Sequence, residues 1–266
     1  IKRMVTHVGK YHMNILLTLR SSHSDFPLDS IDTILAFVGT PFDNTSLRDA
    51  VQLWRSNPEE AKKRHGNISY WNTSEVTDTS CLFLSNKLFN EPIGNWDMRN
   101  VTNMKQMFCG ARSFNQPLRK WNVSKVTNMS AMFYGATSFN QPLRKWKVSK
   151  VTNMFGMFFC AHSFNQPIEK WKVSKVTNMS DMFSSARSFN QPLKSWNVSN
   201  VTTMEEMFDL AKSFKQPLHW WDVSENTNVF NMFGQGDAGI CRGRDVFCNW
   251  YFGYEKCHQH DRPVLN

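Results

Sequence analysis

The residues best suited to site chemistry lie near the end of the chain, where thiols and imidazoles gather. Thiolate sulfur and imidazole nitrogen are the ligands that Zn²⁺ takes in tetrahedral protein sites. The order C-x6-C-x8-C-H-x-H matches no standard zinc finger, and the segment also suits a disulfide or free thiols in a capping segment. We therefore predict no metal and no other cofactor, with a metal site as the alternative. Its ligands would be Cys241, Cys248, Cys257, His258 and His260.

Motifs that carry catalysis are missing from the sequence. It contains no glycine-rich phosphate loop, no H-E-x-x-H and no G-x-S-x-G. Two histidines, His162 and His219, lie in the central part of the chain, and neither recurs at an equivalent position. Acidic residues are also scarce there, so a pair of catalytic carboxylates is not expected. The sequence therefore predicts that the protein is not an enzyme.

The central part of the chain is strongly basic. From Arg112 to Asn200 it holds thirteen Lys or Arg and two acids, a net charge of +11 against +9 for the whole chain. We predict a basic stripe that binds other proteins with acidic surfaces. Alternatively, duplicated repeats simply copied their solvent-facing lysines. Nucleic acid is not the expected partner, because the Trp beside each lysine column suits a core better than a base-stacking platform. The stripe comprises Lys120, Lys125, Lys145, Lys147, Lys150, Lys170, Lys172 and Lys175.

The lysines follow a 25-residue repeat that no insertion interrupts. Phe, Pro, Val and Met recur at the same interval, and so does the tryptophan column. Such regularity is typical of a solenoid, in which each unit buries its apolar face only against its neighbours. We expect Phe and Met to form the core and the Trp column to be half-buried. The tryptophans are Trp71, Trp96, Trp121, Trp146, Trp171, Trp196 and Trp221.

Each repeat is expected to contain short strands and a short helix or 3₁₀ segment. The stretch W-N-V-S-x-V-T-N-M alternates apolar and polar residues, which is the strand period. Met129 to Ala136 places apolar residues at i, i+3, i+4 and i+7, a helical pattern that Ser130 or its counterpart Ser180 would cap. We also expect an asparagine ladder between coils, from Asn90 to Asn190, that ends where Lys215 replaces asparagine.

The consensus FNQPLxxWxVSxVTNMxxMFxxAxSF resembles the leucine-rich-repeat variant of BspA-like bacterial surface proteins and mycoplasma lipoproteins. Similar repeats occur in algae and in large DNA viruses. The resemblance covers about Asn67 to Gly234 and implies a solenoid that binds proteins or builds assemblies. With the pattern above, the expected fold class is an α/β solenoid, a leucine-rich-repeat-like stack of about seven coils. BspA-like bacterial members are exported and adhesive, so a cell-surface adhesin is the alternative function.

The repeats are flanked by segments of different composition. Residues 1–43 are expected to form a basic extended arm, and residues 44–66 a helical cap. In that cap Ser46 with Asp49 resembles a capping box, Asn57 with the following proline breaks the helix, and Gly66 ends it. Residues 67–234 are expected to form the solenoid, and residues 235–266 a Cys-rich cap or tail.

The chain has no apolar run of the roughly 18 residues that a membrane-spanning helix needs. Its basic start is interpreted as an arm or a trimmed start rather than a secretion signal, because it lacks a small-residue cleavage site. We therefore expect a non-enzymatic scaffold that mediates protein–protein interaction. An assembly role in an intracellular complex or a virus particle is favoured over display on a cell surface.

Overall fold

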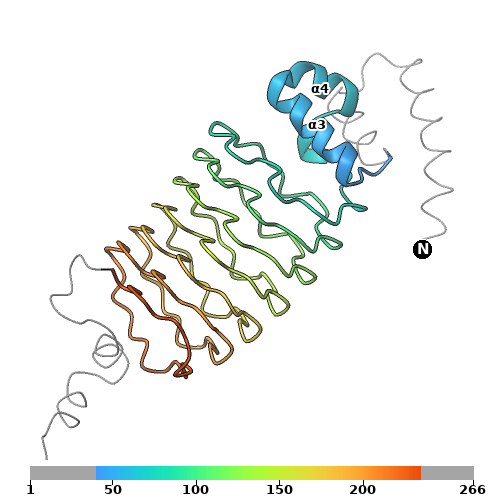
Figure 1. Cartoon of the computed structure of the whole chain (residues 1–266). Helices are drawn as coiled ribbons and strands as arrows, with labels where there is room; N and C mark the ends of the chain where they lie inside the picture. Colours follow the sequence, from blue (N-terminus) through green and yellow to red (C-terminus); the bar gives the residue numbers. More distant parts are fainter. Residues whose placement is uncertain (1–39, 235–266) are drawn as a thin grey trace, which may run out of the picture.

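The computed structural model describes residues 40–234, in which two helices precede a long stack of similar coils (Figure 1). Helices α3 (Asn44–Ser56) and α4 (Pro58–His65) are followed by a short 3₁₀ helix, η1 (Ile68–Tyr70). The coils occupy the rest of the described chain. The expected arm lies outside the described residues except for its last four positions, and the expected C-terminal segment lies outside them entirely.

The start of α3 is fixed by a carboxylate that precedes the helix. An Asp43 carboxylate oxygen accepts a hydrogen bond from the Ser46 backbone N–H at 2.8 Å, and the Ser46 hydroxyl accepts from the Asp43 N–H at 3.0 Å. The prediction that Ser46 and Asp49 form the capping box was therefore wrong, because Ser46 is the third helical residue and not the cap. Asn57 caps the C-terminal end of α3 and Gly66 that of α4, so the helices stop where the sequence predicted.

Helix α3 lies on the first coil of the stack, at its N-terminal end (Figure 1). Leu47, Ala50 and Val51 share one face of the helix and join the hydrophobic core. On the neighbouring face the Arg48 guanidinium contacts an Asp78 carboxylate oxygen at 3.1 Å. The helix therefore covers apolar side chains that the first coil would otherwise expose to water.

The coils stack in a register of 25 residues. One residue of each coil forms a parallel bridge to its equivalent in the next coil, and within residues 40–234 these single bridges take the place of extended strands. A threonine column supports the same register, since the Thr127 N–H donates to the Thr102 carbonyl oxygen at 2.8 Å and Thr152 repeats the contact at 2.9 Å. The bridged residues are Asp78, Asn103, Asn128, Asn153, Asn178, Thr203 and Asn228.

The segment from Met129 to Ala136, expected to be helical, forms consecutive tight turns instead. The Met132 N–H donates to the Met129 carbonyl oxygen at 3.2 Å, and a second turn of the same kind follows. Each has a left-handed residue at its third position, Ala131 with φ 52° and Gly135 with φ 64°. A right-handed helix cannot pass through such residues, so Ser130 caps no helix. We call this segment, with its equivalents, the double turn.

The double turn divides its backbone N–H groups between two kinds of partner. Within the coil, alternate N–H groups close the turns. The N–H groups between them reach the next coil, as when Ala131 donates to the Phe155 carbonyl oxygen at 2.6 Å and Phe133 to that of Met157 at 2.9 Å. An α-helix would satisfy its N–H groups internally, whereas this arrangement connects each coil to the next.

The tryptophan column is part of the core. Trp146 is 3% exposed, and its ring lies parallel to those of Trp121 and Trp171, with centroids 6.3 and 6.5 Å away. Its indole N–H donates to the carbonyl oxygen of Leu118 in the preceding coil at 3.2 Å. The expectation of half-buried tryptophans was therefore wrong. Because the indole N–H has a backbone partner, the whole ring can leave water without an unsatisfied donor.

The asparagine ladder predicted from the sequence is confirmed. The Asn115 side-chain oxygen accepts a hydrogen bond from the backbone N–H of Asn140 at 3.0 Å, and the contact recurs from coil to coil. It ends where the Lys215 N–H donates to Asn190, since lysine has no acceptor to offer to the next coil.

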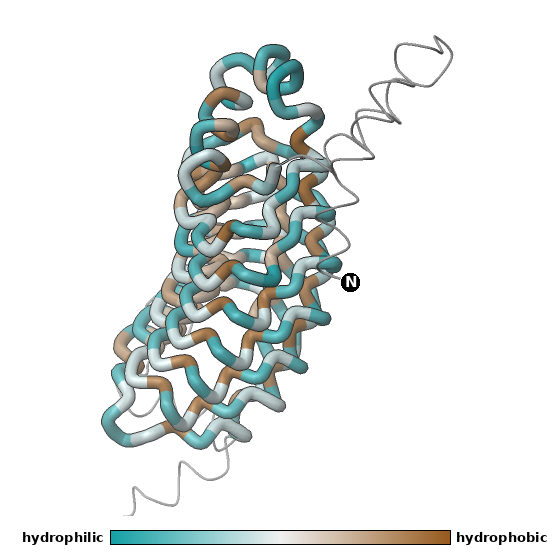
Figure 2. Tube along the Cα trace, turned by 90° about the vertical axis from the view of Figure 1, so that its right-hand side faces the viewer, coloured by the Kyte–Doolittle hydropathy of each residue, from teal (hydrophilic) through white to brown (hydrophobic). Residues whose placement is uncertain are grey.

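Hydrophobic residues recur at matching places in successive coils, as Figure 2 shows along the stack. The phenylalanines, methionines and tryptophans of these places form one continuous core. The assignment to the α/β leucine-rich-repeat-like class stays a prediction, because the described coils contain turns and single bridges rather than longer strands and helices.

Candidate protein-interaction surfaces

The eight lysines singled out in the sequence are all exposed side chains. We call them the lysine stripe. Most lie at tight turns, which the coil around Trp146 illustrates. The Trp146 backbone N–H donates to the Leu143 carbonyl oxygen at 3.0 Å, and the Val151 backbone N–H donates to the Val148 carbonyl oxygen at 2.9 Å. Lys145 and Lys150 thus occupy turn corners.

Buried neighbours hold these corners in place. Leu143, Trp146, Val148 and Val151 are between 0% and 3% exposed, so the backbone on both sides of each turn is anchored in the core. Lys147 lies between two of these buried residues and is itself exposed. The lysine positions are therefore set by the folded core, although their long side chains remain free to move.

Lysines of one column lie a single coil apart. Parallel bridged chains are about 4.8 Å apart, so stacked ammonium groups repel one another unless they spread or find partners. Lys120 and Lys125 donate to the amide oxygens of Asn95 and Asn100, at 3.0 and 2.7 Å. Three ion pairs occur within residues 40–234, and none includes a lysine of the stripe.

A second surface, which sequence reasoning missed, lies on the double turns. It comprises residues 130, 131, 134 and 135 and their equivalents, and we call it the double-turn face. Unlike the core columns, these positions carry different residue types in successive coils, and their exposure ranges from buried, as at Ser130, to exposed, as at Phe155. A search for matching columns passes over them, and a comparison of the positions at which the copies differ would have found them. The face includes Tyr134, Phe155, Phe159, Asp181, Glu205, Glu206 and Asp209.

Aromatic and acidic groups follow one another along the double-turn face. The rings of Tyr134 and Phe159 stack with centroids 4.3 Å apart and planes 7° apart. Further along the stack, burial and the negative charges of Glu206, Glu205 and Asp209 raise the pKa of Asp181 to about 6. The stacked rings are thus followed by a cluster of carboxylates, beside which Leu210 and, one coil later, Phe230 are also exposed.

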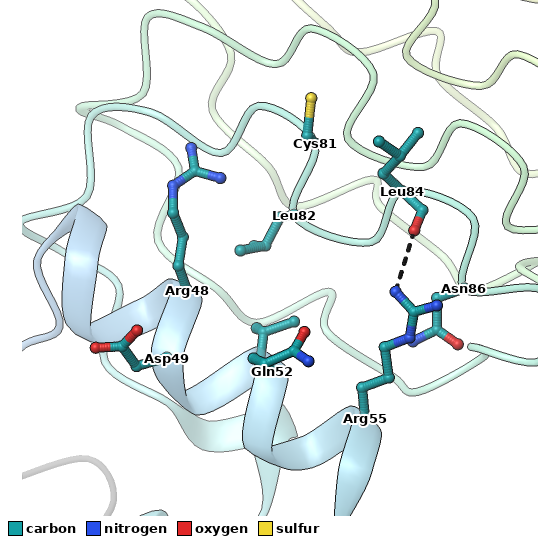
Figure 3. A pocket seen from close by; sticks show the side chains of 9 residues that line it. Arg48, Asp49, Gln52, Arg55, Cys81, Leu82, Leu84 and Asn86 are labelled. Atoms are coloured by element: carbon teal, nitrogen blue, oxygen red, sulfur yellow. Dashed lines mark hydrogen bonds between the residues drawn. The ribbon is translucent and has the colours of Figure 1, made fainter.

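A hollow of about 380 Å³ lies between α3 and the first double turn (Figure 3). Its arginines hold the helix on the stack. Arg48 donates to the Ser80 carbonyl oxygen at 2.6 Å, and Arg55 to the Leu84 carbonyl oxygen at 3.5 Å. The Cys81 thiol, on the opposite wall, lies 3.4 Å from the Gln106 amide oxygen. Since these polar groups serve the packing of α3, the hollow belongs to the helix–coil contact.

The predicted metal ligands, Cys241, Cys248, Cys257, His258 and His260, lie outside the described residues. Within residues 40–234 no three His, Cys, Asp or Glu side chains come together as metal ligands would. Over the same part of the chain no helix is both long and apolar enough to span a membrane.

The stacked coils and their two exposed surfaces define the chain as a repeat protein. The model of the family described as "Mycoplasma protein of unknown function, DUF285" matches residues 53–161 and 140–239, and the chain belongs to this family. This membership agrees with the expectation of a repeat family. The match does not establish the more specific BspA-like assignment. Searches of curated proteins and of solved structures found no match.

Proposed function

We propose that the protein is a non-enzymatic scaffold that binds acidic surfaces of other proteins through the lysine stripe. Its role would be structural, as an assembly component of a larger complex or of a virus particle. The observation that carries this proposal is the stripe itself, eight exposed lysines in ordered columns without a carboxylate partner among the described residues.

The core supports a scaffold function. Each coil contacts the next through backbone hydrogen bonds, stacked rings and the asparagine ladder. The same register recurs between successive described coils, so charges on its turns recur at a regular spacing along its length. A partner whose carboxylates have a similar spacing would gain several contacts at once.

A BspA-like leucine-rich-repeat coil remains our proposal for the class of the repeat. It is supported by the single parallel bridge in each coil, the 25-residue period and the buried aromatic columns. BspA-like membership would be consistent with protein binding, and it does not identify the partner.

Charge reversal along one lysine column tests the proposed function. At low salt we expect the triple variant Lys125→Glu, Lys150→Glu and Lys175→Glu to bind poly-L-glutamate with an affinity roughly tenfold below that of the unmodified chain, or lower still. The matched control reverses Lys62, Lys63 and Lys87, which are exposed lysines outside the stripe. It changes the net charge equally and should retain most of the binding.

Two results would contradict the proposal. The first is equal loss of binding in both triple variants, since this would make net charge rather than the stripe responsible. The second is binding of duplex DNA much tighter than binding of poly-L-glutamate at the same salt concentration, since this would indicate a nucleic-acid site. Circular dichroism of each variant shows whether the fold is retained.

A further inference from the structure

We propose that the double-turn face binds a basic polypeptide segment that also carries an aromatic or large aliphatic side chain. This surface is separate from the lysine stripe and would take a partner of opposite charge. Three features of the face support this assignment: its rings, its carboxylates and their order along the stack.

The aromatic part of the face presents ring surfaces to solvent. Phe155 is 39% exposed, and Phe230 at the equivalent position three coils later is 60% exposed, although the phenylalanines of the repeating columns fill the core. Beside it, Gly156 has no side chain, and a Cβ atom there would lie 3.5 Å from the Tyr134 ring. Gly156 itself is buried, and the stacked rings of Tyr134 and Phe159 beside it are partly exposed. An apolar group placed there would bury surface worth about 25 cal/mol per Å².

The acidic part of the face begins in the next coil. The Asp181 N–H donates to the Glu205 carbonyl oxygen at 2.8 Å, and the Ser185 N–H to the Asp209 carbonyl oxygen at 2.7 Å, so the backbone brings these carboxylates together. The three ion pairs within residues 40–234 include none of them. The amide of Asn228 contacts Glu205 at 3.2 Å and contributes no positive charge.

Charge complementarity selects the occupant. Four carboxylates on two adjacent coils repel one another, so lysine or arginine side chains would relieve that repulsion and gain charge-assisted hydrogen bonds. The rings lie in the two preceding coils. With roughly 4.8 Å between coils, the distance from rings to carboxylates is on the order of 10–15 Å, which three to five extended residues span. The fitting segment therefore has an apolar anchor about four residues from a basic cluster.

Synthetic peptides test this proposal with the whole chain. The probe is a fluorescent peptide with one Phe placed about four residues from three consecutive Arg, and binding is followed by fluorescence anisotropy. Control peptides replace Phe by Ala, or Arg by Glu. We expect binding of the probe to fall about tenfold when Phe is replaced and to be lost when Arg becomes Glu.

Two variants of the chain locate the binding site. The first neutralises carboxylates by Asp181→Asn, Glu205→Gln and Glu206→Gln. The second, Phe155→Ser and Phe159→Ser, introduces the residue found at the same positions one coil later, Ser180 and Ser184, which keeps the fold compatible. Each should weaken probe binding about tenfold. A control, Glu59→Gln and Glu60→Gln on α4, should bind as the unmodified chain does.

Three outcomes would overturn the proposal. The first is equal binding of the probe by the two variants and the unmodified chain. The second is equal binding of the probe and of the control peptide in which Ala replaces Phe. The third is that the protein forms dimers in solution, and that the substitutions Lys125→Glu, Lys150→Glu and Lys175→Glu convert them to monomers. The last would mean that the face receives the lysine stripe of a second copy. Otherwise the lysine-stripe variant should keep its affinity for the probe, so that failure of the two proposals is distinguishable.

Discussion

Replacing Trp146 by Ala should destabilise the protein strongly. The side chain is 3% exposed and lies between the parallel rings of Trp121 and Trp171, so its removal opens a cavity between coils. Such a cavity costs roughly 3–5 kcal/mol. The Leu118 carbonyl oxygen also loses the indole donor, which adds about 1 kcal/mol. The total of about 4–6 kcal/mol is a large part of the roughly 5–15 kcal/mol that stabilises a typical domain.

Urea unfolding, followed by tryptophan fluorescence and circular dichroism, measures this loss. Because each coil contacts only its neighbours, separation of the stack at the cavity would also lower the slope of the transition. Trp146→Phe keeps a ring but not the N–H, and should cost roughly 2 kcal/mol. Lys147→Ala, at the exposed neighbouring position, should change stability by less than about 0.5 kcal/mol. A loss below about 1 kcal/mol in Trp146→Ala would refute the buried tryptophan column.

The remaining predictions concern the ladder, a close contact and a titrating group. Asn140→Ala should lower the free energy of unfolding in urea by about 1–2 kcal/mol, because Asn165 and Gln166 lose the side-chain oxygen that accepts their hydrogen bonds. Asn140→Asp keeps that acceptor and should cost less. Equal losses in the two variants would contradict the ladder. Gly94→Ala should cost about 1–3 kcal/mol, because the new Cβ would meet the Pro117 carbonyl oxygen; an unchanged midpoint would show that the coils can separate. Asp181→Asn should stabilise the protein by about 1 kcal/mol at pH 7.5, a value reduced for solvent screening. In the native chain the raised pKa of Asp181 contributes stability that is fully present below the unfolded value near 3.8 and is lost as pH rises through about 6. The gain in unfolding free energy from Asp181→Asn should therefore vanish near pH 3.5. A gain independent of pH would contradict the charge cluster.

Much of the stack could be predicted from the sequence, because buried positions tolerate few residue types. Trp146 and its equivalents must fill the same space in every coil, so their columns predict which residues stack on which. The asparagine ladder and its end at Lys215 followed from the same reasoning, since a side chain that serves a neighbouring coil must recur in it.

The double turn could not be predicted from the apolar spacing. Met129 to Ala136 has the pattern of an amphipathic helix, and nothing local distinguishes a helix from two tight turns. The two tight turns are favoured by hydrogen bonds to the next coil, such as that from the Ala131 N–H to the Phe155 carbonyl oxygen. These bonds offset the energetic cost of the left-handed backbone conformation at Ala131, which is not a glycine. Tertiary contacts therefore decided the local conformation.

The exposed lysines were predictable as well, because they lie between buried positions of a regular repeat. Their binding partner could not be predicted, since the sequence of the lysine stripe indicates only the sign and the spacing of its charges. The aromatic and acidic groups of the double-turn face escaped for a different reason. Phe155 and Asp181 occupy positions that do not repeat, and a search for repeats treats such positions as noise.

Lysine acylation of the assembled protein tests the central claim most directly. The chain is labelled with an amine-reactive ester in the proposed assembly, as extracted from the native source, and again after isolation, and each site is quantified by mass spectrometry. We predict that the lysine stripe is strongly protected in the assembly, while the exposed Lys62 and Lys63 of α4 react equally in both samples. Equal labelling of the stripe in the two samples would contradict a scaffold that binds through these lysines.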